Sequence, residues 1–454
     1  GHVPADIERL GLEPTGQLPD TTRMHLAIQL PLPDRVSLEQ FISRLYSPAD
    51  ALYHHFLLPA EFADHFGPTE AEYYAAVEYA TSSGLTVTAT HTSRLVMGIS
   101  GTVADVERAF HIRLLTYNHP RDDRTFFAPD AEPSLDLAVP VLRIDGLDDY
   151  EPPRPATDLS GPPPQPLNNQ VQGTGTHDTG AFWGYDFRKA YVPDLALTGT
   201  GQSLGLLEFD SKFDPIDIAE YEDSTGLPHV PLQEVQISPI EGLGRDAPEV
   251  ALNIELAVAM APGLDRIVVF EGQPYSALLA AMADSSSIKQ LSASWTIVGP
   301  VPDHLYMVFA AQGQSFFNAA GNRLAICYPD DDRCQFLNTI TPYATIVGGT
   351  ELTTDGTDAQ TYVSEAVWNG IPTSRGTAGG FCETVALPVW QEGVATVYNE
   401  GSATYRNVPD VACVAAHIWC IYSILPGQHY RQEAYGTSRV LKNPAAAAVP
   451  AACG

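Results

Sequence analysis

The sequence predicts an α/β protein built in two parts, a small α+β domain followed by a larger domain with a parallel β-sheet flanked by helices. Three observations support this fold class. Residues 1–150 carry short helical and strand-like runs in mixed order, residues 151–180 are rich in Pro and Gly, and from residue 181 onward strand-like and helical runs alternate. A chain of 454 residues is also long enough to form more than one hydrophobic core.

The first domain is predicted to be a small α+β sandwich over residues 1–150. Helical apolar spacing covers residues 37–46 and 69–84, and in the second helix Thr69 is the expected N-cap and Gly84 the expected residue just past the end. The other elements expected here are strands at residues 24–30, 85–92, 94–101 and 113–117 and a helix at residues 102–112.

Residues 151–180 are predicted to form an extended, exposed linker. The segment contains seven prolines and almost no large apolar side chain, a composition that cannot build a core. We interpret it as a spacer between two domains. A more specific interpretation is a cleavable junction between a prosegment and an enzyme.

The second domain, residues 181–454, is predicted to contain a parallel sheet. Residues 203–210 read as a buried strand, and residues 247–263 as an amphipathic helix closed by Pro262 and Gly263. Strands that alternate with helices favour a parallel sheet with ligands at the carboxyl ends of the strands. The alternation continues with strands at residues 265–272, 288–295 and 315–322 and helices at residues 276–284 and 305–313.

The charge of the chain excludes two classes of partner. Lys plus Arg number 24 and Asp plus Glu 55, so the formal net charge is −31, which repels nucleic acid and anionic membrane surfaces. Charged residues are only 17% of the chain and hydrophobic ones 44%, so the sequence is that of a folded protein. The low number of cations fits an acidic medium, although ordinary acidic solubility explains it as well. No apolar run is long enough to predict a membrane-spanning helix.

The cysteines predict an oxidising compartment, by secretion or otherwise. Their number is even, they all lie in the last third of the chain, and they include two C-x6-C pairs. The chain begins Gly1-His2 without a basic and apolar leader, so we expect that a signal peptide was removed or never existed. The disulfide candidates are Cys327 with Cys334, Cys413 with Cys420, and Cys382 with Cys453, although sequence alone does not fix connectivity.

Short motifs follow one another in both domains. They are residues 47–72, 100–110 and 144–150 in the first domain and 187–210, 249–253, 292–295, 341–352, 376–391, 406–415 and 435–438 in the second. Taken together and in this order, these motifs resemble the sedolisin family, the serine-carboxyl peptidases of the kumamolisin type. The resemblance implies a subtilisin-like parallel sheet preceded by a ferredoxin-like activation domain.

The resemblance implies a site of four residues, because the family needs a Glu and an Asp four positions apart on one helix face, a second Asp, and a Ser nucleophile. The Glu takes the proton of the Ser, the first Asp orients the Glu and shares its proton, and the second Asp donates to the oxyanion while protonated. In this chain the positions map to Glu249, Asn253, Asn322 and Ser438, and the last two are 116 positions apart.

Two of these four positions carry an amide where the family pattern has an acid. Asn322 can still donate a hydrogen bond to an oxyanion without needing a proton. Asn253 can hold Glu249 but cannot accept or share its proton. Ser438 is followed by Arg439 instead of a small residue, and the chain ends before the family's calcium-binding segment, so we expect neither calcium nor another cofactor.

Three functions remain open at this point. A pseudo-peptidase, or an enzyme repurposed for non-hydrolytic chemistry in the former active-site pocket, explains both amides together. The alternative is an acid serine-carboxyl endopeptidase with a Ser438–Glu249 dyad and Asn322 as oxyanion donor, and the third is a peptide-binding or inhibitory protein. In each case the expected partners are a peptide or small molecule in the groove and the chain's own prodomain.

Simpler roles also exist for the candidate residues. Glu249 and Asn253 could form a polar helix face, Asn322 a turn, and Ser438 a helix N-cap. The neighbouring residues 292–295 are expected to form core and pocket wall rather than to take part in chemistry.

Overall fold

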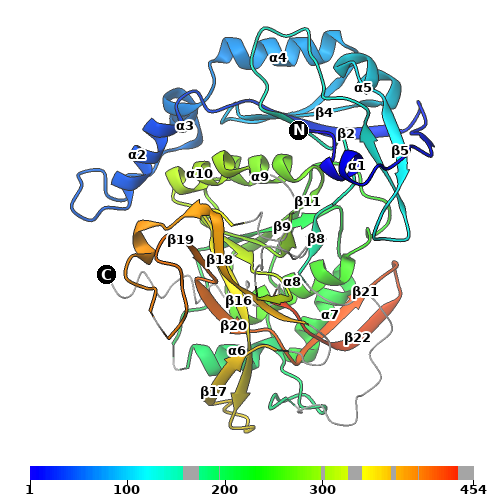
Figure 1. Cartoon of the computed structure of the whole chain (residues 1–454). Coiled ribbons are helices and arrows are strands. Elements are labelled where there is room, and N and C mark those ends of the chain that lie inside the picture. Colours follow the sequence, from blue (N-terminus) through cyan, green and yellow to red (C-terminus); the bar gives the residue numbers. More distant parts are fainter. Residues whose placement is uncertain are drawn as a thin grey trace. The chain divides into compact units, whose positions relative to one another are not determined.

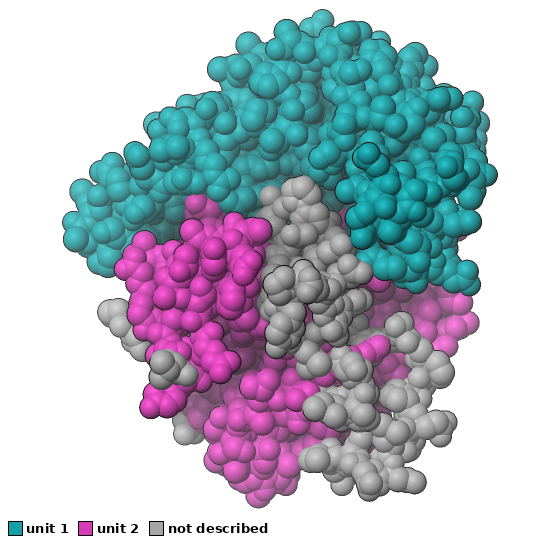
Figure 2. All heavy atoms as spheres, in the orientation of Figure 1, with its two compact units in different colours: residues 1–152, 272–286, 302–313 teal, residues 153–271, 287–301, 314–454 magenta. Residues whose placement is uncertain are grey.

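The computed structural model describes residues 1–156, 173–193, 195–297, 302–325, 340–369, 375–396 and 398–437 (Figure 1). These residues divide into two compact units, which Figure 2 distinguishes by colour. Unit 1 comprises residues 1–152, 272–286 and 302–313, and unit 2 the remainder. The predicted domain boundaries at residues 150 and 180 stay predictions, because units defined by contact need not follow the order of the chain.

The centre of unit 1 is a four-stranded antiparallel sheet in the order β3-β4-β2-β7. Its elements follow one another as β2, α4, β3, β4, α5 and β7, which is the split βαβ arrangement of ferredoxin-like folds. The predicted ferredoxin-like α+β domain is therefore confirmed. The bounds are β2 Arg23–Gln29, α4 Glu70–Ser82, β3 Thr86–Thr90, β4 Val96–Thr102, α5 Val103–Phe110 and β7 Arg143–Asp145.

Local sequence signals set the ends of α4, as predicted. The Thr69 side chain accepts from the backbone N–H of Glu72, and the Glu72 carboxylate accepts from the backbone N–H of Thr69 in return. At the other end Gly84 has φ +88°, the left-handed conformation that glycine adopts without strain. Both ends of this helix could therefore be read from residue type.

Two helices from later in the chain also belong to unit 1. Helix α9 (Tyr275–Asp284) packs against β2 and β4, and helix α10 (Asp303–Gln312) against α2 and α3. Figure 1 shows α4 and α5 on one face of the sheet and α9 and α10 on the other. The remaining elements of unit 1 are α1 Ala5–Arg9, α2 Arg35–Leu45, α3 Pro59–Phe66, and the three-stranded sheet of β1 Gly16–Gln17, β5 Leu114–Asn118 and β6 Thr125–Pro129.

Unit 2 is organised around an eight-stranded sheet in the described residues, ordered β10-β11-β9-β12-β14-β16-β17 with β20 also paired to β16. Strand β12 pairs in parallel with β9 and β14, and β14 pairs in parallel with β16, whereas β17 runs antiparallel to β16. The bounds are β9 Ser203–Phe209, β10 Leu232–Gln236, β11 Arg266–Gly272, β12 Gln290–Ala293, β14 Ser315–Ala319, β16 Thr345–Thr354, β17 Tyr362–Val367 and β20 Val411–Val414.

The helix α8 (Ala247–Met260) forms the centre of the unit 2 core. All of its residues are buried, and it packs against α6, α7, β9 and β21. The predicted parallel sheet flanked by helices is thereby confirmed. The other elements of unit 2 are α6 Gly184–Tyr191, α7 Pro215–Thr225, η2 Val389–Gln391, β8 Arg154–Pro155, β13 Trp295–Thr296, β15 Arg323–Ala325, β18 Gly376–Ala386, β19 Tyr405–Val408, β21 Ile418–Ser423 and β22 His429–Ala434.

The predicted bond between Cys413 and Cys420 is wrong, since no disulfide joins the described cysteines. Cys413 lies on β20 within the large sheet, whereas Cys420 lies on β21, which pairs with β22 in a separate sheet. Cys382 is buried on β18 and also forms no disulfide, which contradicts the bridge expected to Cys453. Cys327, Cys334 and Cys453 lie outside the described residues, so the first pair stays a prediction.

The helices of the described residues give no candidate for a membrane span, because none of them combines sufficient length with sufficient hydropathy.

Candidate active site

Helix α8 places the two predicted residues Glu249 and Asn253 one turn apart. Glu249 lies in the first turn and is 2% exposed, and Asn253 is fully buried. Positions i and i+4 share one helix face, so the two polar groups lie on the same side within an otherwise apolar core. Burial of two polar side chains in a core helix requires partners, and those of Asn253 come from two strands.

Glu208, near the end of β9, binds the side chains of both Asn253 and Trp295. Its Oε1 accepts a hydrogen bond from Asn253 Nδ2 at 2.8 Å, and its Oε2 accepts from Trp295 Nε1 at 3.2 Å. Ser294 Oγ donates to the other end of the amide, Asn253 Oδ1, at 3.1 Å. Glu208 is fully buried, and each of its two carboxyl oxygens accepts a hydrogen bond.

Sequence reasoning missed Glu208. It lies in the segment 203–210, which was interpreted only as a buried strand and its following loop. The signal that could have revealed it is an acid close to the carboxyl end of a buried parallel strand, where sites of α/β folds are built. The neighbouring residues Ser294 and Trp295 are buried as expected and contribute to the wall of the site.

Asn322 lies in a second part of the site, directly after Gly321. Its Oδ1 accepts from Thr437 N at 2.8 Å and from Thr437 Oγ1 at 3.0 Å, although the two residues are 115 positions apart. Gly321 N in turn donates to Thr437 Oγ1 at 3.0 Å. Thr437 immediately precedes Ser438, which lies outside the described residues, so the position of Ser438 itself stays a prediction.

A short stretch of the predicted linker lies in this site. Strand β8 pairs antiparallel with β13, with Pro155 opposite Trp295 and Arg154 opposite Thr296. The next residue, Ala156, is held at both backbone groups.

The N–H of Ala156 donates to Ser294 O at 2.8 Å, and its carbonyl accepts from Asn322 Nδ2 at 2.5 Å. The residue is 3% exposed. The expectation of an exposed spacer is therefore wrong at this residue, because two backbone hydrogen bonds and burial of a methyl group outweigh the solvation of a short segment.

Ser294 connects the two parts of the site. Its side chain contacts Asn253, and its backbone carbonyl holds Ala156. The structure thus brings together, within unit 2, the helix that carries Glu249 and Asn253, the Asn322 turn and an extended peptide strand. The arrangement can align a peptide carbonyl against an amide donor.

Buried acids adjoin the site. Burial raises the pKa of Asp246, the N-cap residue of α8, and that of Asp210. Glu271 is fully buried, and burial together with the nearby charge of Glu234 raises its pKa to about 8. Lys212 Nζ, 3.8 Å from Glu271 Oε2, opposes that shift. Burial therefore shifts these three carboxyl groups toward the protonated form, which an acidic medium favours.

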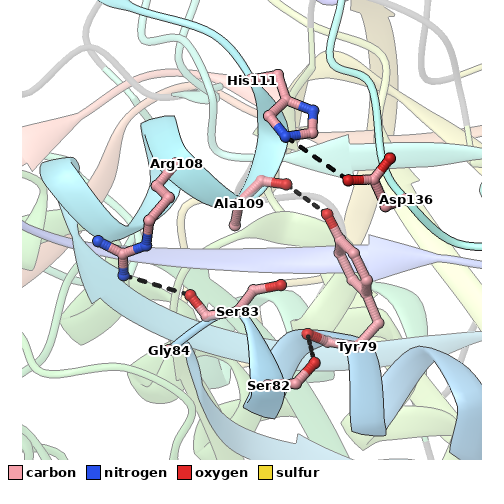
Figure 3. A pocket seen from close by; sticks show the side chains of 8 residues that line it. All are labelled: Tyr79, Ser82, Ser83, Gly84, Arg108, Ala109, His111 and Asp136. Atoms are coloured by element: carbon pink, nitrogen blue, oxygen red, sulfur yellow. Dashed lines mark hydrogen bonds and ion pairs between the residues drawn. The ribbon is translucent and has the colours of Figure 1, made fainter.

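The activation-domain part of unit 1 contains a separate pocket of about 460 Å³ (Figure 3). It lies between the ends of α4 and α5, and its walls make structural bonds, such as Arg108 Nη2 to Ser83 O at 3.4 Å and the hydroxyl of Tyr79 to Ala109 O. No predicted site residue lines it. In the described part of the chain, no cluster of three or more His, Cys, Asp or Glu side chains could hold a metal ion.

Comparison with known proteins connects these units to one family. Residues 11–150 match the activation domain of pro-kumamolisin. The chain is 26% identical over 374 residues to kumamolisin of Bacillus sp. (strain MN-32). It is 24% identical over 449 residues to sedolisin of Pseudomonas sp. (strain 101). It is 23% identical over 465 residues to xanthomonalisin of Xanthomonas sp. (strain T-22).

These three alignments cover most of the chain but less of each relative. They cover 77%, 91% and 87% of the chain and 66%, 74% and 53% of the relatives, in the same order. The chain therefore spans between half and three quarters of the lengths of these relatives.

A solved structure of Pseudomonas sedolisin complexed with two molecules of pseudo-iodotyrostatin aligns with a TM-score of 0.48 and 21% identity. The alignment covers 61% of this chain and 79% of that one, and at this level of similarity it carries no further weight.

Residues 11–150 therefore match the activation domain of pro-kumamolisin, and most of the chain is similar in sequence to kumamolisin and sedolisin.

Proposed function

We propose that this chain is a sedolisin-type proenzyme whose groove holds an extended peptide. It hydrolyses this peptide so slowly that the bound peptide stays intact for long periods. The observation that carries the proposal is the way in which the backbone of Ala156 is bound. Its carbonyl accepts a hydrogen bond from Asn322 Nδ2, and its N–H donates one to Ser294 O. A strand paired to β13 and held by its backbone is the way in which sheet-edge sites bind peptides.

The slow step is expected at the general base. Asn253 donates to Glu208 and accepts from Ser294, so hydrogen bonds hold both ends of its amide. An amide cannot take up the proton that Glu249 would receive from a nucleophile. In a serine-protease triad the change from Asp to Asn behind the base lowers kcat by about 10⁴. A reduction of this order would leave the linker intact for long periods.

The direct test is the integrity of the full chain. We expect intact mass spectrometry to show an uncleaved chain after a day at each pH between 3 and 8. Rapid cleavage after Ala156 in the unmodified chain would contradict the proposal.

Restoring an acid tests the reason for the slow hydrolysis. We expect Asn253→Asp to cleave the bond after Ala156 in acid, where the added carboxyl and Glu208 can share a proton. The matched control is Asn253→Asp combined with Ser438→Ala, which removes the hydroxyl nucleophile and should leave the chain intact. Cleavage in the control would assign the activity to a contaminating peptidase.

One observation favours a second function, a slow serine-carboxyl peptidase that uses Glu249 and Ser438. The Asn322 amide already lies on the carbonyl of Ala156, and an amide donates to a developing oxyanion at any pH. This function predicts cleavage over days that Ser438→Ala abolishes and Asn322→Ala slows by about 10²–10³-fold.

We further propose that the protein is secreted, as its kinship with these peptidases suggests, and that it works in an acidic medium. The support for acidity is the net charge of −31 together with the buried acids beside the site.

A further inference from the structure

We propose that the groove selects a small apolar residue, alanine above all, at the position whose carbonyl rests on Asn322. The inference rests on the proposed peptide-binding function and names the class of peptide that the same groove holds. It follows from where the side chain of Ala156 lies and from what surrounds it.

The methyl group of Ala156 is enclosed by a small apolar cluster of unit 2. Each member is less than 5% exposed, so the side chain of Ala156 points into packed protein and not into solvent. The cluster is formed by small side chains and one large one that closes the space. Its other members are Ala319, Val347, Trp368, Ala415 and Ala416.

The walls of this pocket are fixed by the sheet. Ala319 and Val347 face each other as paired residues of β14 and β16. Trp368 is held by its backbone, since its N–H donates to Gly349 O at 3.1 Å and its carbonyl accepts from Thr377 N at 3.0 Å. Widening the pocket would therefore require the movement of sheet backbone and not only a change of side-chain rotamer.

The neighbourhood also has little spare volume. A Cβ added to Gly349 would lie 2.6 Å from the Cβ of Ala415, 3.2 Å from the Cγ2 of Thr437 and 3.4 Å from the Cε3 of Trp368. The first of these distances is a collision. A region that cannot accept one methyl group at residue 349 is closely packed around the side chains that enclose Ala156.

The direction of the Ala156 side chain is set by its backbone. The hydrogen bonds to Ser294 O and from Asn322 Nδ2 fix both peptide groups, so a larger side chain cannot turn toward solvent while both bonds remain. A bulky residue must leave the groove and take the backbone with it. Pro155, the last residue of β8, directly precedes Ala156. The position before Ala156 therefore tolerates a residue without a backbone N–H.

The test is a size series at residue 156 in the full chain. Hydrogen exchange of the residue 156 amide, corrected for intrinsic rate, reports whether the segment stays in the groove. We expect Ala156→Gly and Ala156→Ser to keep protection within about threefold of the unmodified chain, and Ala156→Leu and Ala156→Phe to lose at least tenfold. The Tm should stay unchanged, because the segment leaves the groove without unfolding the core. The matched control is Ala359→Phe, an exposed loop alanine of unit 2, which should change neither quantity.

A compensating change distinguishes a pocket from a general effect of side-chain size. We expect Ala156→Val to lose part of the protection. Val347→Ala enlarges the cluster, and we expect it to restore at least part of that loss when the two changes are combined. If Leu or Phe at residue 156 is as protected as alanine, the inference is wrong while the peptide groove stands. If the amide of the unmodified chain exchanges freely, the proposed function itself fails.

Discussion

In unit 1 a surface carboxylate is held charged and a buried histidine neutral, whereas in unit 2 buried carboxyls are held neutral. Hydrogen bonds from Thr102, followed by Arg108, lower the pKa of Asp105 to about 2, and burial lowers the pKa of His304 to about 4. In unit 2 burial raises the pKa of Glu255 well above its ordinary value and that of Glu271 to about 8. His304 of unit 1 and Glu271 of unit 2 therefore make the stability of their units respond to pH in opposite directions.

The sign follows from proton uptake on unfolding. His304 binds a proton more readily once unfolded, so its contribution to the stability of unit 1 is lost as pH falls from 6.5 toward 4. Glu271 binds its proton more tightly when folded, so the stability of unit 2 is lost as pH rises from 4.5 toward 8. Asp148 opposes this trend in unit 1, because burial raises its pKa to about 6. An acidic medium thus favours unit 2 and weakens much of unit 1.

The largest effect is expected from Glu271→Gln. Within the described residues neither carboxyl oxygen of Glu271 has a hydrogen-bond partner, so removing its charge removes the cost of burying it and loses only the 3.8 Å ion pair with Lys212. We expect the free energy of unfolding to rise by about 3 kcal/mol at pH 8 and to change little at pH 4.5. Urea unfolding at both pH values measures it. The control Glu234→Gln, at an exposed neighbour, should give less than about 1 kcal/mol. Equal effects at the two pH values would refute the assignment.

A smaller effect of opposite sign is expected from His304→Leu. His304 faces the carboxylates of Asp145 and Asp303 and the guanidinium of Arg35, and within the described residues its Nε2 has no hydrogen-bond partner. When the pH falls from 7 to 4.5, we expect unit 1 of the variant to lose about 2 kcal/mol less of its free energy of unfolding than unit 1 of the unmodified chain.

Hydrogen exchange of the core amides of β2 and β4 at the two pH values measures this change in unit 1 specifically. His65→Leu, at an exposed histidine of α3, is the matched control and should leave the pH dependence unchanged. An acid loss of the same size in His304→Leu and the unmodified chain would assign the sensitivity to other groups.

The smallest effect is expected from Asp284→Asn at the end of α9. The Asp284 carboxylate lies 2.9 Å from His91 Nδ1 and accepts from Thr92 N at 2.9 Å. Asparagine keeps the bond from Thr92 and loses only the charge. We therefore expect about 0.5–1 kcal/mol less stability in unit 1 at pH 6, measured by urea unfolding. The control Asp64→Asn, at an exposed carboxylate, should give no measurable change. A loss well beyond this range would mean that Asp284 does more than pair with His91.

Residue patterns predicted several of the longer helices and the central strands because those signals are local. The ends of α4 follow from Thr69 and Gly84, and the strong apolar run of residues 247–263 follows α8 closely. The disulfide prediction failed because C-x6-C spacing says nothing about which sheet each cysteine enters. Glu208 was missed because a single acid in a strand has no partner that is visible along the sequence.

The sequence by itself determined the alternation of strands and helices in the second domain, the acidic charge and the resemblance to an activation domain followed by a peptidase-like domain. These properties depend on local spacing and on residue type. Only the tertiary structure decided that α9 packs on the activation-domain sheet and that Glu208 holds Asn253. It also decided that Ala156 rests on Asn322. Each of these contacts joins residues far apart in the chain, and the distance between such residues is set by how sheets and helices pack.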